Sequence, residues 1–119
     1  MTKLTVRLLV AAVVLCALAA VFVTNSAAQA PQQYTAWGSV QEIEAGWAED
    51  TMAVRHSAPL VNPSACPVTN AGYATNPADT GHNLFHTLLI SALLNKKEVS
   101  LLISGCAYSK PHVLAVKIH

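Results

Sequence analysis

An apolar segment near the N-terminus limits what this chain can fold into. Leu8–Val23 is an uninterrupted run of sixteen apolar residues, and Lys3 and Arg7 precede or adjoin it as a positive start. The run falls short of the roughly 20 apolar residues that a membrane-spanning helix needs. It leads to Ala-Gln-Ala at residues 28–30, a small-x-small pattern of the kind that signal peptidase cleaves. We therefore expect residues 1–30 to be a cleaved export signal.

Two other interpretations of this segment remain open. An uncleaved membrane anchor would use the same apolar run. A lipoprotein is less favoured, because Leu15 stands before Cys16 where a small residue is wanted. The cleaved signal predicts a secreted or periplasmic protein that keeps no stable membrane span.

The remaining chain, residues 31–119, is long enough for one domain only. Of seven basic residues, Lys3 and Arg7 leave with the signal, so five face six acidic residues and the mature net charge is near −1. A balance of this kind lacks the basic surface of a nucleic-acid-binding protein. We therefore expect no nucleic-acid partner.

Two cysteines, Cys66 and Cys106, remain after cleavage. Export would place them in an oxidising compartment, where an even pair indicates a disulfide. Two separate thiols or an intermolecular bond are the alternatives. No C-x-x-C spacing supports a zinc site, so we expect neither metal nor cofactor.

Alternation of polar and apolar residues predicts strands on both sides of a proline-rich loop. Tyr34–Ile43 and Asp50–His56 form the first expected hairpin, with Gly38 as a bulge or bend. Three prolines exclude helix and central strand from Ser57–Thr69, which we expect to be a loop held by Cys66. The other expected strands are residues 72–75, 98–105 and 112–119.

A helical period is clear between Leu84 and Leu94. Asn76 and Pro77 resemble a helix start, but Gly81 weakens that turn, so the firm helix is expected to begin nearer His82. The apolar face comprises Leu84, Phe85, Leu88, Leu89, Ala92 and Leu93.

The order of these elements is strand, strand, short strand, helix, strand, strand. It predicts a mainly β domain with one helix, a small five-stranded OB-like barrel whose helix lies between strands three and four. Ile90 and Leu94 fall outside the apolar face of the helix, four residues apart, and are our candidates for an oligomer contact.

Side chains that suit catalysis occur without a diagnostic arrangement. His82 and His86 are four apart, as in a two-histidine metal site, but no glutamate follows His82 and no third ligand has diagnostic spacing. The acidic residues between Glu42 and Asp50 are explained better by a solvated hairpin than by acid–base chemistry. We expect no catalytic residues and no enzyme activity.

Aromatic residues are more informative, because their faces stack on sugar rings and on bases alike. Trp47 lies between the first two expected strands, and Tyr108 follows Cys106. Both positions predict exposure, so Trp47 and Tyr108 are candidate ligand-binding residues.

The C-terminal third resembles the end of the cholera-toxin-like B subunits, the secreted pentameric lectins of AB-type bacterial toxins. The resemblance covers residues 84–118: a helix, a strand that reaches Cys106, then Tyr108, then Lys110-Pro111-His112, and a last alternating strand. It implies an OB barrel that binds cell-surface glycans, with Tyr108 stacking on the sugar and Lys110 helping to hold it. The chain departs from that family in its mid-chain Cys66 and in lacking an N-terminal helix. Subtilase-cytotoxin B subunits share the expected element order.

Together these features predict a secreted, non-enzymatic binding module for a glycan or protein ligand that forms a homo-oligomer in the manner of toxin B subunits. The alternative is a periplasmic or extracellular protein-interaction factor, such as an inhibitor, an immunity-like factor or an assembly subunit. Its contact surface would be Ile90, Leu94 and the loop Ser57–Thr69.

Overall fold

The structure, a computed structural model, describes residues 29–119. The predicted export signal lies outside these residues except for its last two positions. The described elements, in chain order, are β1 (Gln32–Tyr34), β2 (Gly38–Ala45), β3 (Met52–His56), β4 (Tyr73–Ala74), α2 (His82–Asn95), β5 (Glu98–Ala107) and β6 (Lys110–Ile118).

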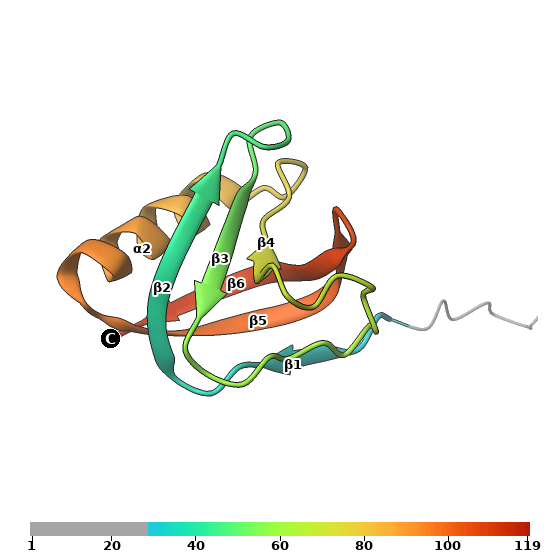
Figure 1. Ribbon diagram of the computed structural model, residues 1–119, viewed down its shortest axis with the longest axis horizontal. Coiled ribbons are helices and arrows are strands. Elements are labelled where there is room, and N and C mark those ends of the chain that lie inside the picture. Colours follow the sequence, from blue (N-terminus) through green and yellow to red (C-terminus); the bar gives the residue numbers. More distant parts are fainter. Residues whose placement is uncertain (1–28) are drawn as a thin grey trace, which may run out of the picture.

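The six strands form one sheet that closes on itself (Figure 1). Its order is β1-β5-β2-β3-β4-β6, and a further pairing of β5 with β6 completes a ring. All neighbours are antiparallel except β4 and β6, which are parallel and are joined at Ala74 and His112. The domain is therefore mainly β with one helix among the described residues, as the sequence predicts.

The strand count and the place of the helix differ from the prediction of five strands with the helix after the third. The expected first strand divides into β1 and β2, so α2 follows the fourth strand. Thr35 makes the break: its hydroxyl accepts a hydrogen bond from Leu101 N at 3.0 Å, and its carbonyl accepts one from Ser100 Oγ at 2.8 Å. These bonds hold Thr35 against β5, and β1 and β2 then pair with different parts of that strand.

The core fills the inside of the ring. Its fully buried members include Val54, Tyr73, Leu89, Leu101 and Val113. Each such aliphatic side chain contributes roughly 1.5–3 kcal/mol on leaving water. The helix packs against β2, β5 and β6, and it buries Leu89 and Ala92.

Helix α2 begins at His82, directly after Gly81, and not at Asn76, as expected. Gly81 is its N-cap and gives no side-chain hydrogen bond. Asn76 instead caps a separate turn, where its side-chain oxygen accepts a hydrogen bond from Ala78 N at 2.9 Å. At the other end Lys96 adopts a left-handed conformation (φ 53°), and Lys97 N donates to Ala92 O, which closes the helix.

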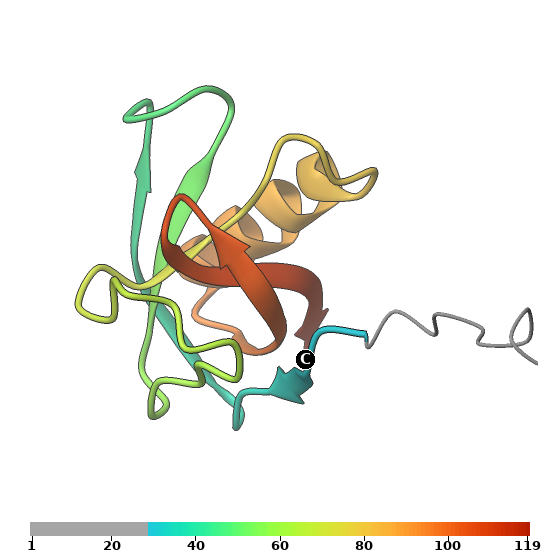
Figure 2. The ribbon, with the colours of Figure 1, turned by 90° about the vertical axis from the view of Figure 1, so that its right-hand side faces the viewer.

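The proline-rich segment Ser57–Thr69 forms a loop on the side of the molecule opposite α2 (Figure 2). The predicted disulfide is present: Cys66 and Cys106 are bonded, with their Cα atoms 5.7 Å apart. Ser64 Oγ also accepts a hydrogen bond from Gly105 N at 2.8 Å. The loop is thus fixed to the end of β5, next to the turn that leads into β6.

Candidate functional site

The three predicted ligand-binding residues lie together. Trp47 belongs to the β2–β3 loop, Tyr108 belongs to the turn between β5 and β6, and Lys110 is the first residue of β6. The rings of Trp47 and Tyr108 meet edge to face, with centroids 5.1 Å apart at 82°. Lys110 Nζ lies 3.9 Å from the centroid of the Trp47 ring. With Glu49, described next, these residues form what we term the aromatic cluster.

Glu49 connects the two loops. The Tyr108 hydroxyl donates a hydrogen bond to Glu49 Oε2 at 2.5 Å. This bond raises the pKa of Tyr108 above its ordinary value, with desolvation as a second cause, so the phenol stays neutral. Sequence reasoning assigned Glu49 to a solvated hairpin. The two residues are 59 positions apart, and no local pattern signals such a contact.

The turn that presents Tyr108 has an unusual backbone. Ala107 pairs with Lys110, so Tyr108 and Ser109 alone connect β5 to β6. Both have positive φ angles, 50° and 65°, as a two-residue type I′ turn requires. Asn and Gly normally occupy these positions, and other residues there are strained. Strain of this kind is concentrated at functional sites.

Trp47 carries a second local cost. Its indole nitrogen is buried and has no hydrogen-bond partner among the described residues. A buried donor left unpaired costs about 1–3 kcal/mol. This unfavourable group lies in contact with the strained Tyr108 turn. Selection for stability alone therefore does not explain the conformation of these two loops.

The cluster offers an aromatic ring beside groups of both charge signs. Tyr108 is 38% exposed. Glu49, whose carboxylate accepts the hydrogen bond from the Tyr108 hydroxyl, is exposed as well. The Lys110 ammonium supplies hydrogen-bond donors, and Glu49 supplies acceptors. Such an arrangement suits a ring-shaped ligand that carries hydroxyl groups.

A separate depression of about 250 Å³ lies beside the mid-chain loop. Arg55, His56, Asn70 and Tyr73 are among its lining residues, and none of the aromatic cluster lines it. Arg55 is partly engaged here, because its Nε binds Glu42 at 3.1 Å. Glu42, one of the acidic residues of the first hairpin, is thus paired with Arg55.

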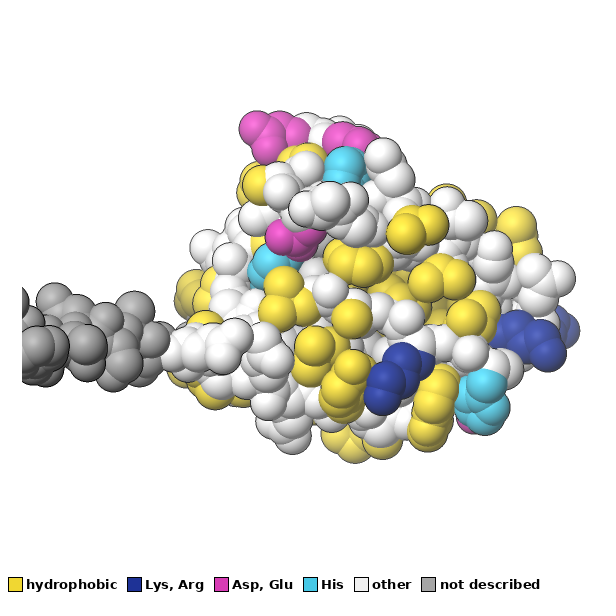
Figure 3. Space-filling view, turned by 180° about the vertical axis from the view of Figure 1, so that it is seen from behind, with side chains coloured by type: hydrophobic (Ala, Val, Ile, Leu, Met, Phe, Trp, Pro, Cys, Tyr) yellow, Lys and Arg dark blue, Asp and Glu magenta, His cyan; other side chains and the backbone are white. Residues whose placement is uncertain are grey.

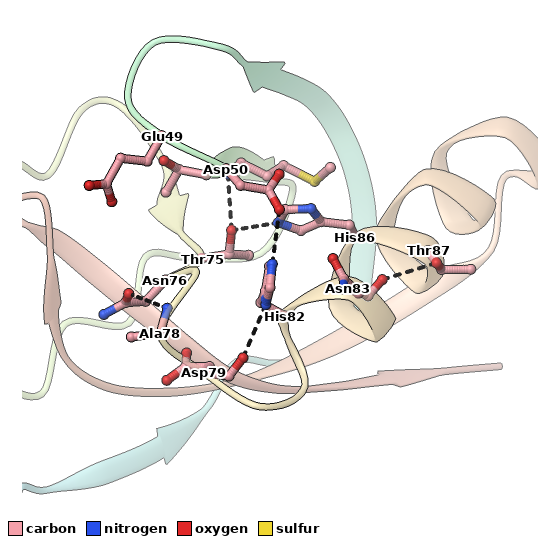
Figure 4. A network of polar contacts seen from close by, with 12 residues as sticks. Glu49, Asp50, Thr75, Asn76, Ala78, Asp79, His82, Asn83, His86 and Thr87 are labelled. Carbon is pink, nitrogen blue, oxygen red and sulfur yellow. Dashed lines mark hydrogen bonds and ion pairs between the residues drawn. The ribbon is translucent and has the colours of Figure 1, made fainter.

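His82 and His86 contact different partners, as Figure 4 shows. His82 Nε2 lies 2.9 Å from Asp50 Oδ2, and His86 Nε2 lies 2.7 Å from Thr75 Oγ1. Their rings are 5.5 Å apart and nearly perpendicular. Within residues 29–119 no group of three or more His, Cys, Asp or Glu side chains is placed to hold a metal ion.

The predicted oligomer-contact residues are on the surface. Ile90 is 43% exposed and Leu94 is 75% exposed. Leu84, which the helical period assigns to the buried face, is 68% exposed because only the centre of that face meets the sheet. Figure 3 shows a group of apolar side chains on the face of the molecule that lies behind the view of Figure 1.

Over residues 29–119 none of the helices has the length and apolar character needed to cross a bilayer. Comparison of the chain with protein-family models, with curated proteins and with solved structures finds no significant match.

Proposed function

We propose that the protein is an exported, non-enzymatic binding module with an OB-like barrel, and that the aromatic cluster binds a glycan. The observation that carries this proposal is the contact of Trp47 with Tyr108 and Lys110 across two loops.

The strand order supports the OB assignment. If β1 is set aside, the ring β5-β2-β3-β4-β6 has one parallel pair, β4 with β6, and one helix between β4 and β5. OB barrels have five strands and bind oligonucleotides or oligosaccharides with the first and last hairpin loops. In this chain those loops are the β2–β3 loop and the β5–β6 turn, which together carry the cluster.

Charge favours a sugar over a nucleic acid. The chain after residue 30 has a net charge near −1, and a carboxylate, Glu49, lies in the cluster. Phosphate backbones are bound through several lysines and arginines, whereas sugar hydroxyls pair with carboxylates and ammonium groups together.

Recognition without turnover is supported by the place of Thr75. Its hydroxyl meets His86, the closest approach here to an activated nucleophile, but Thr75 is fully buried. A hydroxyl that no substrate can approach does not act as a nucleophile. The disulfide and the predicted export signal support a location outside the cytoplasm.

A glycan array tests the proposal, with the protein purified after export from the full chain. Tyr108→Ala removes the exposed ring, and loss of one stacking contact is expected to weaken binding about tenfold or more. Tyr34→Ala is a matched control, because Tyr34 is 43% exposed and also has a lysine, Lys117, 3.9 Å from its ring centroid. Equal binding by both variants would remove the site assignment.

A second candidate function is protein interaction through the exposed face of α2. Ile90 and Leu94 favour it, because they lie four residues apart on one side of the helix and both are exposed, which makes an apolar stripe. Light scattering on the native protein tests it, with Leu94→Glu as the disrupting variant. A ring of five would support kinship with toxin B subunits, and a monomer that captures no partner would count against this surface.

A further inference from the structure

His82 faces hydrogen-bond acceptors on both sides of its ring. Its Nε2 lies 2.9 Å from the Asp50 carboxylate, and its Nδ1 lies 3.1 Å from the Asp79 carbonyl oxygen (Figure 4). A neutral imidazole has a single N–H, so it satisfies one of these acceptors only. The imidazolium donates to both. The local geometry therefore selects the protonated ring, and its contacts with Asp50 and Asp79 raise the pKa of His82.

The other titratable groups around His82 come from four parts of the fold. Asp50 belongs to the β2–β3 loop, Asp79 to the β4–α2 loop, and His86 to α2 itself. His112 of β6 contacts the Asp79 carboxylate, with Nε2 2.5 Å from Oδ2. Burial lowers the pKa of His86; the nearby Asp50 carboxylate opposes this effect, and the charge of His82 adds to it.

Two neighbouring carboxylates hold the β2–β3 loop at different places. Glu49 accepts a hydrogen bond from Tyr108 in the β5–β6 turn, while Asp50 binds His82 at the start of α2. Trp47 lies in the same loop. The Asp50–His82 contact therefore acts on the same short loop that carries Trp47 and Glu49 of the aromatic cluster.

We propose that protonated His82 clamps the β2–β3 loop through Asp50 and thereby sets the aromatic cluster in its binding arrangement. The cluster then binds its ligand best in mildly acidic solution and less well once His82 has lost its proton. The ligand part of this inference rests on the proposed glycan-binding function, whereas the clamp itself does not.

Trp47 provides a direct readout, because Trp37 is the only other tryptophan in the chain. In a Trp37→Phe background, Trp47 emission is followed between about pH 5 and 9. We expect one step with a midpoint above 6.5, the ordinary value for histidine. Trp37→Phe also removes the contact between Trp37 and His119, whose ring centroids are 4.1 Å apart.

Variants then identify the group that titrates. His82→Gln should abolish the step, and Asp50→Asn should move its midpoint downward, because the carboxylate that favours the imidazolium is gone. His119→Gln is the control: it removes an exposed histidine that contacts Glu98 at 3.4 Å, and it should leave the step unchanged. A step that persists in His82→Gln, or emission that does not change with pH, overturns the clamp.

Glycan affinity measured at both ends of the same range tests the ligand part. Stronger binding in acid that is lost in His82→Gln supports it, and binding independent of pH overturns it. If the array finds no glycan at all, the proposed function fails, and the emission step still decides whether the clamp exists.

Discussion

Among the glycines, Gly72 is the one at which an added Cβ would meet the closest backbone atom, and replacing it with alanine should destabilise the fold strongly. Gly72 precedes β4 and has a φ angle of +74°. A Cβ atom there would lie 2.3 Å from Val54 O and 2.8 Å from the Val54 carbonyl carbon. These atoms belong to β3, which pairs with β2 on one side and β4 on the other, so they cannot withdraw easily.

Two effects make up the expected loss in the free energy of unfolding of Gly72→Ala. The left-handed backbone costs an L-residue about 1–2 kcal/mol, and forcing an extra carbon into a packed site costs about 1–3 kcal/mol more. Gly46→Ala and Gly105→Ala are matched controls. Both glycines have positive φ angles, +84° and +68°, but a Cβ at either meets nothing within 4 Å. The controls should therefore lose only the free energy that is due to the left-handed backbone.

Urea unfolding followed by circular dichroism, with the disulfide intact, measures the difference. At a slope of about 1 kcal/mol per molar urea, the midpoint of Gly72→Ala should lie about 1–3 M below those of the two controls. Midpoints that coincide for all three variants would refute the argument, because they would show that the Val54 carbonyl gives way without cost.

Four further changes have definite expected outcomes. Ser109→Gly and Lys96→Gly should each raise the free energy of unfolding by about 1 kcal/mol, because both residues have positive φ angles; Ser109→Ala should bring no gain in the same urea assay. Replacing Cys66 and Cys106 together should lower the free energy of unfolding by about 4 kcal/mol, from chain-entropy arithmetic for their separation of 40; a loss below 1 kcal/mol would contradict it. Burial lowers the pKa of His86, so its contribution to stability is present above pH 6.5 and is lost as the pH falls through the lowered pKa. Thermal melts of His86→Gln should therefore fall less steeply in acid than those of the unmodified protein.

Local patterns predicted those elements of the fold that depend on neighbours in sequence. Residues 98–105 form a strand, as their alternation predicts, although Ser100 and Ser104 are buried together with the apolar face; Gly81 and His82 mark the true start of α2. The pairing of Cys66 with Cys106 followed from their number and the expected compartment.

The turn after β5 was harder to predict, because its residues are atypical. Residues 106–111 resemble a longer link, yet β5 extends to Ala107 and only Tyr108 and Ser109 form the turn. Type I′ turns are identified in a sequence by Asn-Gly or similar pairs. A tyrosine and a serine give no such signal.

The aromatic residues of the candidate site could be selected by type and position, but their contacts could not. Trp47 and Tyr108 are separated by 61 positions, and only the closed ring brings their loops together. The contact of His82 with Asp50 spans 32 positions and depends on how α2 lies across the sheet. Partners at such distances follow from topology and not from periodicity.

Strand β6 is paired extensively with β5 on one side and only briefly with β4 on the other. Along β5 and β6 the pairing continues from Val99 with Ile118 to Ala107 with Lys110, whereas β4 meets β6 only at Ala74 and His112. Thermal opening is concentrated where the fewest hydrogen bonds must break. The sheet is therefore expected to open first between β4 and β6. The Cys66–Cys106 disulfide still ties the β5–β6 hairpin, which carries Tyr108, to the mid-chain loop. The domain can thus open locally at this pair of strands without unfolding.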